Sequence, residues 1–406
     1  MMRIAYICAD PGVPVFGSKG CSIHVQEIVR AMSDRGATVE IFAARTGGAA
    51  PHDLTDCLVH ELPLAKTNDT KSREMEQIRW NQRVVNALNA RGRFDLLYER
   101  HALWSCDAMC WAKQHGVPSV LEVNSPLVDE QAGHRELVQK DLARTLTRKA
   151  MRNASMTYVV SDSIVGYCGQ FLSADQTVQV IANGVNLDRF SPAVKSADPF
   201  DGITFGFIGS LKPWHGVEEL IDGYARFCAA KSTSITLKSL KSRLVIVGDG
   251  PQRVAIERQS RQLGVESHIK FVGSVAPDSV PNWLTAIDIA IAPYPDLDHF
   301  YFSPLKLFEY MAAGRVTLAS AIGQIQNVVQ HDVNGWLYPP GEVDKLAEAM
   351  FLLCSQKTTR ERLGAAARKT AAAHSWRGVL DQIMAHATGP LGLVTNLQGA
   401  RDEIAI

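Results

Sequence analysis

Several features that mark particular classes of protein are missing from this sequence. The net charge is zero, because 42 basic residues balance 42 acidic ones, and this balance argues against general binding to nucleic acid. No uninterrupted apolar run approaches the ~20 residues that a membrane-spanning helix needs. The first residues hold one short apolar run, without a basic leader, a long apolar segment or a cleavage site. We therefore expect a cytoplasmic protein.

Cysteine patterns and nucleotide-binding glycine patterns are also incomplete. The eight cysteines stand singly, apart from Cys106 and Cys110, whose one-turn spacing suits neither a disulfide framework nor a complete zinc site. No Walker loop is present, because no Gly-Lys-Ser/Thr follows a glycine at the required spacing. The run Gly248-Asp-Gly250-Pro-Gln-Arg253 has arginine where a dinucleotide-binding fingerprint has its third glycine. This departure argues against a dehydrogenase.

The sequence does contain a repeated alternation of strand-like and helix-like segments. Short apolar runs of strand length lie at residues 3–9, 39–44, 94–98, 119–123 and 156–160, and again at 203–208, 244–247, 269–272, 287–292 and 316–319. Helical segments between them include residues 23–35, preceded by Ser22 as the cap, 103–115, a stretch around 135–152, and 217–229. The alternation predicts an α/β fold with two Rossmann-like, doubly wound parallel sheets.

A linker and a ligand site follow from this plan. Residues 190–202 are rich in Ser, Pro, Ala and Asp and predict a linker. We place an N-terminal domain at residues 1–192 and a C-terminal domain at 200–375. Ligands of doubly wound sheets bind outside the carboxyl ends of the strands, so two facing copies would hold a ligand in the cleft between them.

The segment from Ser303 to Gly314 is the best clue to chemistry. Ser303 suits the N-cap of a helix, and Pro304 suits the next position, where no amide is needed. Lys306 then falls in the first turn, where the positive end of the helix dipole repels it unless an anion binds nearby. Glu309 follows on the same face. A phosphate beside a hydroxylated group fits both side chains; an ordinary capped helix with a solvated lysine is the alternative.

Two glycine-containing loops follow predicted strands. The loop at residues 17–20 could bring backbone amides against a diphosphate, or its glycines could serve the turn alone. The loop at residues 209–216 adds Lys212 and His215 as donors for a phosphate, with Trp214 available to stack or pack. Its alternative is a structural loop whose tryptophan covers the domain surface.

Two further groups of charged residues have both functional and structural interpretations. Asp296 and Asp298 could bind a divalent metal beside a nucleotide sugar, although a surface turn contains the same residues. A basic group recurs at helical spacing between residues 140 and 153. It could contact an anionic membrane surface or an acidic acceptor, or simply be solvated. The residues of this basic group are Arg144, Arg148, Lys149 and Arg152.

Five motifs together resemble the retaining family 4 glycosyltransferases of GT-B fold. Residues 35–39 are similar to the end of that family's first helix, and residues 180–190 to its passage into the second domain. Residues 244–251 and 308–314 resemble its C-terminal signatures, and 334–339 the turn beyond them. The likeness runs over most of the chain in the family's order. It implies the GT-B fold and transfer of a sugar from a nucleotide diphosphate sugar.

The resemblance also implies roles for individual residues. Glu309 corresponds to the acidic residue that binds the nucleotide ribose, and residues 302–305 lie near the phosphates or the donor sugar. A C-terminal helix at about residues 376–388 would return to the N-terminal domain. The donor-binding residues that we expect are Gly17, Gly20, Ser210, Lys212, His215, Gly248, Tyr301, Phe302, Ser303, Pro304, Leu305, Lys306 and Glu309.

The sequence departs from the family at four of these functional positions. The family's usual Arg and Lys for the diphosphate align with Ser210 and His215, within a Trp-His-Gly variant of the phosphate loop. The first glutamate of the acidic pair is Tyr301, and the frequent histidine of the catalytic cleft is Asn124. These departures suggest a subgroup with an altered, weaker donor site.

The leading hypothesis is retaining sugar transfer without a metal or other cofactor. Lys306 and His215 would stabilise the leaving diphosphate, and Asn124 would act in the cleft. Glu99, Arg100 and Asn124 are the residues expected near the acceptor, although Glu99 and Arg100 could instead form a structural ion pair. The alternatives are a catalytically silent partner protein of the same fold, a sugar-nucleotide epimerase, and a metal-dependent transferase that uses Asp296 and Asp298.

Overall fold

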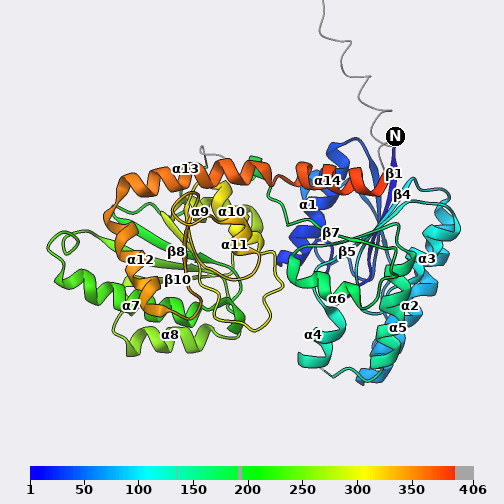
Figure 1. Cartoon of the computed structure of the whole chain (residues 1–406), viewed down its shortest axis with the longest axis horizontal. Helices are drawn as coiled ribbons and strands as arrows, with labels where there is room; N and C mark the ends of the chain where they lie inside the picture. The colour runs from blue at the N-terminus through cyan, green and yellow to red at the C-terminus, as the bar shows by residue number, and fades with distance from the viewer. Residues whose placement is uncertain (135, 191–193, 389–406) are drawn as a thin grey trace, which may run out of the picture. The chain divides into compact units, whose positions relative to one another are not determined.

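The chain forms two compact units, each built on its own parallel sheet (Figure 1). The computed structural model describes residues 1–134, 136–190 and 194–388. The first unit combines Met1–Ala182 with the segment that begins at Trp376, and the second comprises Asn183–Ser375. The boundary after Ala182 lies before the predicted linker, because Asn183 already hydrogen-bonds to Ser303 of the second unit.

The first unit contains a seven-stranded sheet in the order β3-β2-β1-β4-β5-β6-β7, with every pair of neighbouring strands parallel. The central strands are almost fully buried, which explains why they are mostly apolar in the sequence rather than alternating, apart from Glu99, Arg100 and Glu122. The strands are β1 (Arg3–Cys8), β2 (Thr38–Ala43), β3 (Leu58–Glu61), β4 (Leu96–Arg100), β5 (Ser119–Val123), β6 (Met156–Val159) and β7 (Val178–Val180).

The helices of the first unit differ from the prediction in two places. Ser22 does not cap the first helix, because Lys19 already has the extended backbone of a capping residue and Ser22 is buried inside α1. The helix expected around residues 135–152 begins later, as α5 at Lys140, and a separate helix that the sequence analysis does not predict, α4, precedes it at Leu127–His134. The helices are α1 (Gly20–Asp34), α2 (Thr70–Arg91), α3 (Asp107–Gln114), α4 (Leu127–His134), α5 (Lys140–Asn153), α6 (Val165–Gly169) and α14 (Trp376–Thr388).

Helix α14 packs on α1 within the first unit. Arg377 donates to Asp34 at 3.1 and 3.2 Å, and Arg35 pairs with Asp381. The ring of Trp376 meets the His24 ring edge-on, with 4.9 Å between centroids. The segment at residues 376–388 thus belongs to the same compact unit as residues 1–182.

The second unit repeats the plan with six parallel strands in the order β10-β9-β8-β11-β12-β13. The strands are β8 (Ile203–Ile208), β9 (Ser242–Val247), β10 (Ile269–Gly273), β11 (Ile289–Ala292), β12 (Val316–Ser320) and β13 (Trp336–Tyr338). The helices are α7 (Val217–Thr233), α8 (Arg253–Gln262), α9 (Val280–Thr285), α10 (Leu305–Ala312), α11 (Ile325–Val328), α12 (Val343–Ser355) and α13 (Lys357–Ala373).

Both sheets reverse their strand order once, and this reversal locates the candidate sites. The order changes direction between β1 and β4 in the first unit and between β8 and β11 in the second. Ligands of open α/β sheets bind at such a switch point, outside the carboxyl ends of the strands. The loops to inspect are therefore those after β1 and β4, and those after β8 and β11.

Candidate functional site

Three loops, after β8, β9 and β11, pack backbone against backbone at the carboxyl edge of the second sheet. Gly248, after β9, has φ 140°, and a Cβ there would lie 1.9 Å from the carbonyl oxygen of Gly209, after β8. A Cβ on Gly216 would lie 1.7 Å from the carbonyl oxygen of Pro293, after β11. Only glycine permits these approaches. The Leu211 amide donates to the Asp249 carbonyl at 2.9 Å, and this hydrogen bond joins the loop after β8 to the loop after β9.

Lys306 reaches from α10 into this group of loops. Its ammonium nitrogen is buried and has no hydrogen-bond partner among the described residues. The nitrogen lies 4.3 Å from the centroid of the Phe207 ring, and 5.2 Å from that of the Tyr294 ring. A Cβ built on Gly209 would come within 2.9 Å of it. Lys306 therefore sits beside the loop after β8, against two aromatic rings and the backbone of a glycine.

Burial lowers the pKa of the Lys306 ammonium to about 7, although the charge of Glu309 acts in the opposite direction. A buried charge without a partner is costly, and the free energy of protonation reports that cost. An anion that arrived at the Lys306 nitrogen would remove it. Lys306 lies in the first turn of α10, where the sequence predicts that the helix dipole disfavours a positive charge. Burial disfavours that charge as well.

His215 lies near Lys306, and its imidazole ring is neutral. Its Nδ1 lies within hydrogen-bond distance of the Ser210 carbonyl oxygen, so Nδ1–H donates and Nε2 carries the lone pair. Burial, together with the charge of Lys306, lowers the pKa of His215 to about 3. In this form His215 accepts hydrogen bonds through Nε2 and has no second proton to donate. A role as donor to a phosphate, as expected from the sequence, requires that the ring be protonated.

Helix α10 begins later than predicted. Pro304, not Ser303, is its N-cap, and no side chain of the described residues caps the helix. The Ser303 hydroxyl instead accepts from the Asn183 amide at 3.0 Å, and the Ser303 carbonyl accepts from Nδ2 of Asn183 at 2.6 Å. Ser303 is thereby engaged with a residue far away in the chain. Leu305 and Lys306 lie in the uncapped first turn, where backbone amides can meet an anion.

The remaining predicted donor residues lie around this turn. Tyr301 and Phe302 precede α10, with 4.5 Å between their ring centroids, and both are half-buried. Glu309 follows Lys306 by one turn of α10 and is also half-buried. In the loop after β8, Ser210 is exposed, and the Lys212 nitrogen lies 5.6 Å from the centroid of the Trp214 ring. Trp214 is itself 42% exposed, so it does not plug the surface.

In the first unit, the predicted residues Arg100 and Asn124 meet at a carboxylate that the sequence did not single out. Glu122, at the end of β5, is fully buried. Arg100 donates to its Oε1 at 2.9 Å, and Nε2 of His24 lies 2.6 Å from the same oxygen. The Asn124 amide and the Tyr98 hydroxyl also donate to Glu122.

The partners of Glu122 outweigh its desolvation. Burial alone would raise the pKa of Glu122, but His24 and Arg100 hold it far below its usual range. The cluster therefore contains an ionised carboxylate with several donors around it. The only sequence signal for it was the position of Glu122 at the end of a buried strand, which is unusual for a charge. His24 came from α1, which no local pattern linked to β5.

Glu99 does not join this cluster. Successive side chains of a strand point to opposite faces, so Glu99 faces away from Tyr98 and Arg100. Both its carboxylate oxygens are buried without a hydrogen-bond partner among the described residues. Burial raises the pKa of Glu99 to about 7, although the nearby Ser105 hydroxyl acts in the opposite direction without meeting the geometry of a hydrogen bond. The ion pair considered for Glu99 and Arg100 is therefore wrong, because Arg100 pairs with Glu122 instead.

The loop at residues 17–20 leads into α1. A Cβ on Gly17 would lie 2.6 Å from the Ser22 hydroxyl, so glycine is needed there for packing. The Gly17 carbonyl accepts from the Gln26 amide at 3.0 Å. Gly20 opens α1 and is exposed. These contacts explain Gly17 structurally, and the start of α1 has no side-chain cap among the described residues.

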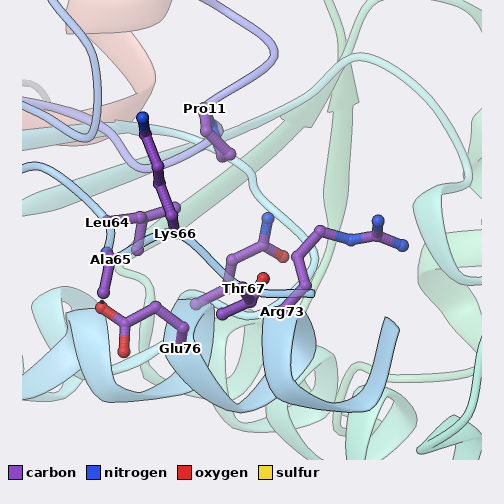
Figure 2. Close-up of a pocket in the computed structure, with 8 residues that line it drawn as sticks. Pro11, Leu64, Ala65, Lys66, Thr67, Arg73 and Glu76 are labelled. Carbon is purple, nitrogen blue, oxygen red and sulfur yellow. Dashed lines mark hydrogen bonds between the residues drawn. The ribbon is translucent and has the colours of Figure 1, made fainter. Parts of the chain in front are cut away.

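A pocket of about 230 Å³ lies in the first unit, between the loop after β1 and the first turns of α2 (Figure 2). Pro11 stands on one side of the pocket, and residues 64–67 line another. Lys66 and Arg73 bring positive charge to it. The carboxylate of Glu76 accepts from the Ala65 amide at 2.9 Å and from Arg83, so its charge is already balanced. No residue of this pocket was predicted from the sequence.

The predicted basic group lies on α5 as expected, and its side chains have partners within the first unit. The guanidinium groups of Arg144 and Arg148 lie over the Phe171 ring, at 5.1 and 5.9 Å. Lys149 pairs with Asp107 at 2.8 Å, and Arg152 donates to the Phe171 carbonyl at 3.1 Å. Contact with a membrane therefore stays a prediction, and these contacts give the cluster a structural purpose.

The described residues offer no evident metal site and no membrane-spanning helix. Asp296 and Asp298 are exposed. No three or more His, Cys, Asp or Glu side chains of the described ranges are grouped so that they could hold a metal ion. Between residues 1 and 388, outside the gaps given above, no helix has both the length and the apolar character needed to cross a bilayer.

Comparisons with known proteins agree with the resemblance noted in the sequence. The family described as "Glycosyltransferase Family 4" matches residues 18–189, and "Glycosyl transferases group 1" matches residues 193–370. A D-inositol 3-phosphate glycosyltransferase of Saccharomonospora viridis is 23% identical over 406 residues, covering 92% of this chain and 90% of that protein.

Solved structures show the same fold. Sucrose-phosphate synthase from Thermosynechococcus elongatus is similar with a TM-score of 0.72 at 20% identity, covering 94% of this chain and 97% of that chain. HepE of Anabaena, solved in complex with UDP and glucose, has a TM-score of 0.67 at 20% identity, with 94% and 98% covered. These likenesses establish the GT-B fold, with two Rossmann-like parallel-sheet domains.

Proposed function

The chain belongs to glycosyltransferase family 4, and from that premise we propose that it transfers a sugar from a nucleotide diphosphate sugar to an acceptor, with retention of anomeric configuration. The observation that carries this proposal is Lys306. It is a buried cation without a hydrogen-bond partner among the described residues, at the switch point of the second sheet. An anionic leaving group is the partner that such a site lacks.

The donor diphosphate would bind between the first turn of α10 and the loop after β8. There it meets the Lys306 ammonium, the amides of Leu305 and Lys306, and Lys212. Negative charge grows on the diphosphate as the glycosidic bond breaks, so these groups stabilise the transition state more than the ground state. Support comes from HepE, whose structures contain UDP, UDP with glucose, and UDP-glucose.

Two further side chains would orient the donor. Glu309, one turn after Lys306, is placed to accept hydrogen bonds from the ribose hydroxyls. His215 is neutral, with the lone pair on Nε2, and would accept a hydrogen bond from a hydroxyl of the donor sugar. In this assignment the phosphate-binding cation of the family's loop after β8, where this chain has Ser210 and His215, is replaced by Lys306 from α10.

The acceptor would bind to the first unit. The pocket of Figure 2 carries Lys66 and Arg73, while Glu76, the one carboxylate among the described residues that line it, is balanced by Arg83. This excess of positive charge favours an acceptor that combines hydroxyl groups with a negative charge, in keeping with the names of relatives that act on inositol 3-phosphate. Arg100 and Asn124 are bound to Glu122 and would act by fixing the end of β5 rather than by holding the acceptor directly.

The experiment that tests the proposal is an assay of the purified protein with a panel of nucleotide diphosphate sugars. We expect slow donor hydrolysis without an acceptor and faster turnover with one, without loss of activity in chelator. Absence of both reactions with every donor would favour a catalytically silent partner protein. Conversion of a donor to its epimer would favour the epimerase. Loss of activity in chelator would favour a metal site at Asp296 and Asp298.

Localisation and membrane contact stay proposals. A cytoplasmic enzyme could bind an anionic inner membrane surface through α5, where Arg144, Arg148, Lys149 and Arg152 lie. Sedimentation with vesicles that contain anionic lipid tests this directly. Because the four side chains already have partners in the protein, we expect binding only at low ionic strength.

A further inference from the structure

The Lys306 ammonium is enclosed by two aromatic rings and a glycine. The faces of the Phe207 and Tyr294 rings lie at 4.3 and 5.2 Å from it, and Gly209 closes a third side. Phe207 comes from β8, and Tyr294 from the segment after β11, so the two strands of the switch point each supply one ring. Aromatic faces attract a cation only weakly compared with water or a carboxylate.

The two rings are themselves held in place. Phe207 is fully buried and Tyr294 is 2% exposed. The His215 ring stands edge-on to Tyr294, with 5.8 Å between centroids, and the Phe300 ring also stands edge-on to Tyr294, with 4.9 Å between centroids. This packing leaves little freedom for the rings to move away and admit water to the lysine nitrogen.

We infer that Phe207 and Tyr294 are positioning residues that keep the Lys306 nitrogen desolvated and without an anion, so that the donor diphosphate supplies its partner and binds together with a proton. The inference rests on the proposed function. The proton comes from the solvent and is taken up at Nζ of Lys306, and no covalent bond is made or broken. Neither ring touches the reacting atoms in this account.

The other charged and titratable groups near Lys306 are not expected to take up the proton when the diphosphate binds. From α10, Glu309 favours the charged lysine, whereas His215 and Lys212, from the loop after β8, carry no negative charge. The Tyr310 hydroxyl is bonded to the Ile208 backbone, and burial raises the pKa of Tyr294, so both phenols stay neutral. Because the pKa of Lys306 is lowered to about 7, its nitrogen is mostly uncharged at pH 8.

The test is calorimetric titration of the full-length protein with UDP, in buffers of different ionisation enthalpy. At pH 8, where the terminal phosphate of UDP is already ionised, we expect uptake of about 0.9 proton per UDP, which is the fraction of neutral amine for a pKa of about 7. The affinity for UDP should fall about tenfold for each pH unit above 7.

Variants separate the roles. Lys306→Arg keeps a cation that stays charged, so UDP should bind without proton uptake and without the pH dependence. Tyr294→Phe keeps the ring face and should behave as the wild type. Phe207→Leu and Tyr294→Leu admit water and should shift the pH dependence upward, lowering proton uptake at pH 8. Lys270→Arg is the matched control, because Lys270 also lies over an aromatic ring, with its nitrogen 5.6 Å from the centroid of Trp283, but is distant from Lys306 in the chain. Proton uptake should stay unchanged in this variant.

Two results would overturn the inference alone. UDP could bind to the wild type at pH 8 without proton uptake, or the uptake could persist in Lys306→Arg, which would assign the proton to His215. If neither UDP nor any other nucleoside diphosphate binds at any pH, the proposed function fails as well.

Discussion

Each unit of this protein buries charge at the carboxyl ends of its strands, but the two units treat that charge differently. In the first, the Glu122 carboxylate is surrounded by His24, Arg100, Tyr98 and Asn124. In the second, the Lys306 ammonium has aromatic rings around it and no hydrogen-bond partner among the described residues. A charge whose bonding capacity is used within the fold stabilises the fold. A charge without a partner is available to a ligand.

The largest effect that we expect comes from removing the carboxylate of the Glu122 cluster in the first unit. Glu122→Ala leaves His24 and Arg100 buried without their anion, and should cost about 3–5 kcal/mol in the free energy of unfolding. Chemical denaturation measures this loss. Because the pKa of Glu122 is lowered in the folded state, its contribution is present above the unfolded value of 4.5 and is lost as pH falls below it. An unfolding free energy equal to that of the wild type at pH 7 would show that the cluster is not stabilising.

Lys306→Met should lower activity without lowering stability, the reverse of what we expect for Glu122→Ala. Turnover per bound donor should fall by about 10²–10³-fold, because one preorganised donor to the leaving group is lost. The unfolding free energy of the ligand-free protein should not fall, since the substitution removes a buried charge that has no partner. Steady-state kinetics and denaturation on the same preparation measure both. Normal turnover would remove Lys306 from the donor site.

Glu99 sharpens the comparison, because its buried carboxylate oxygens have no hydrogen-bond partner among the described residues, whereas Glu122 in the same unit has several. Its pKa is raised from 4.5 to about 7, so the folded state binds the proton more tightly than the unfolded state. Its destabilising effect is absent below pH 4.5, grows as pH rises to 7, and is constant above that. Glu99→Gln should therefore raise stability by roughly 3 kcal/mol at pH 8 and leave it unchanged near pH 4. A loss of stability at pH 8 would mean that Glu99 has a partner in solution.

The smallest of these effects concerns the nucleotide. Glu309→Ala removes a carboxylate placed for the ribose hydroxyls, and hydrogen bonds to a charged group are worth about 1.5–3 kcal/mol. We expect the affinity for UDP to fall about tenfold or more, with little change in stability because Glu309 is half-buried. Glu348→Ala, on an exposed face of α12, provides a matched control. Equal affinities of Glu309→Ala and wild type would show that the ribose role is wrong.

Much of the fold could be predicted from local patterns. Ser119–Val123 and Ile203–Ile208 have the predicted ends, because strands buried on both faces are mostly apolar, although Glu122 interrupts the first of them. Helix α4 is not predicted at all, and α5 begins at Lys140, later than expected. The start of α10 was also misplaced: Ser303 is a good N-cap locally, but Asn183 takes its hydroxyl.

The candidate site was only partly accessible to the same reasoning. The conflict between Lys306 and the helix dipole could be recognised within one turn of sequence. The rings that enclose Lys306 could not, because Phe207 and Tyr294 lie about 100 and 12 residues away and meet it only through the sheet. The same holds for His24 and Glu122, whose contact joins α1 to β5. Partners that are distant in sequence leave no periodic signal.

A crystal structure of the protein with UDP tests the central claim most directly. The account predicts a diphosphate oxygen within about 3 Å of Nζ of Lys306, at the uncapped start of α10. A nucleotide bound elsewhere, with the Lys306 nitrogen still enclosed by Phe207 and Tyr294 and without an anion, would contradict it.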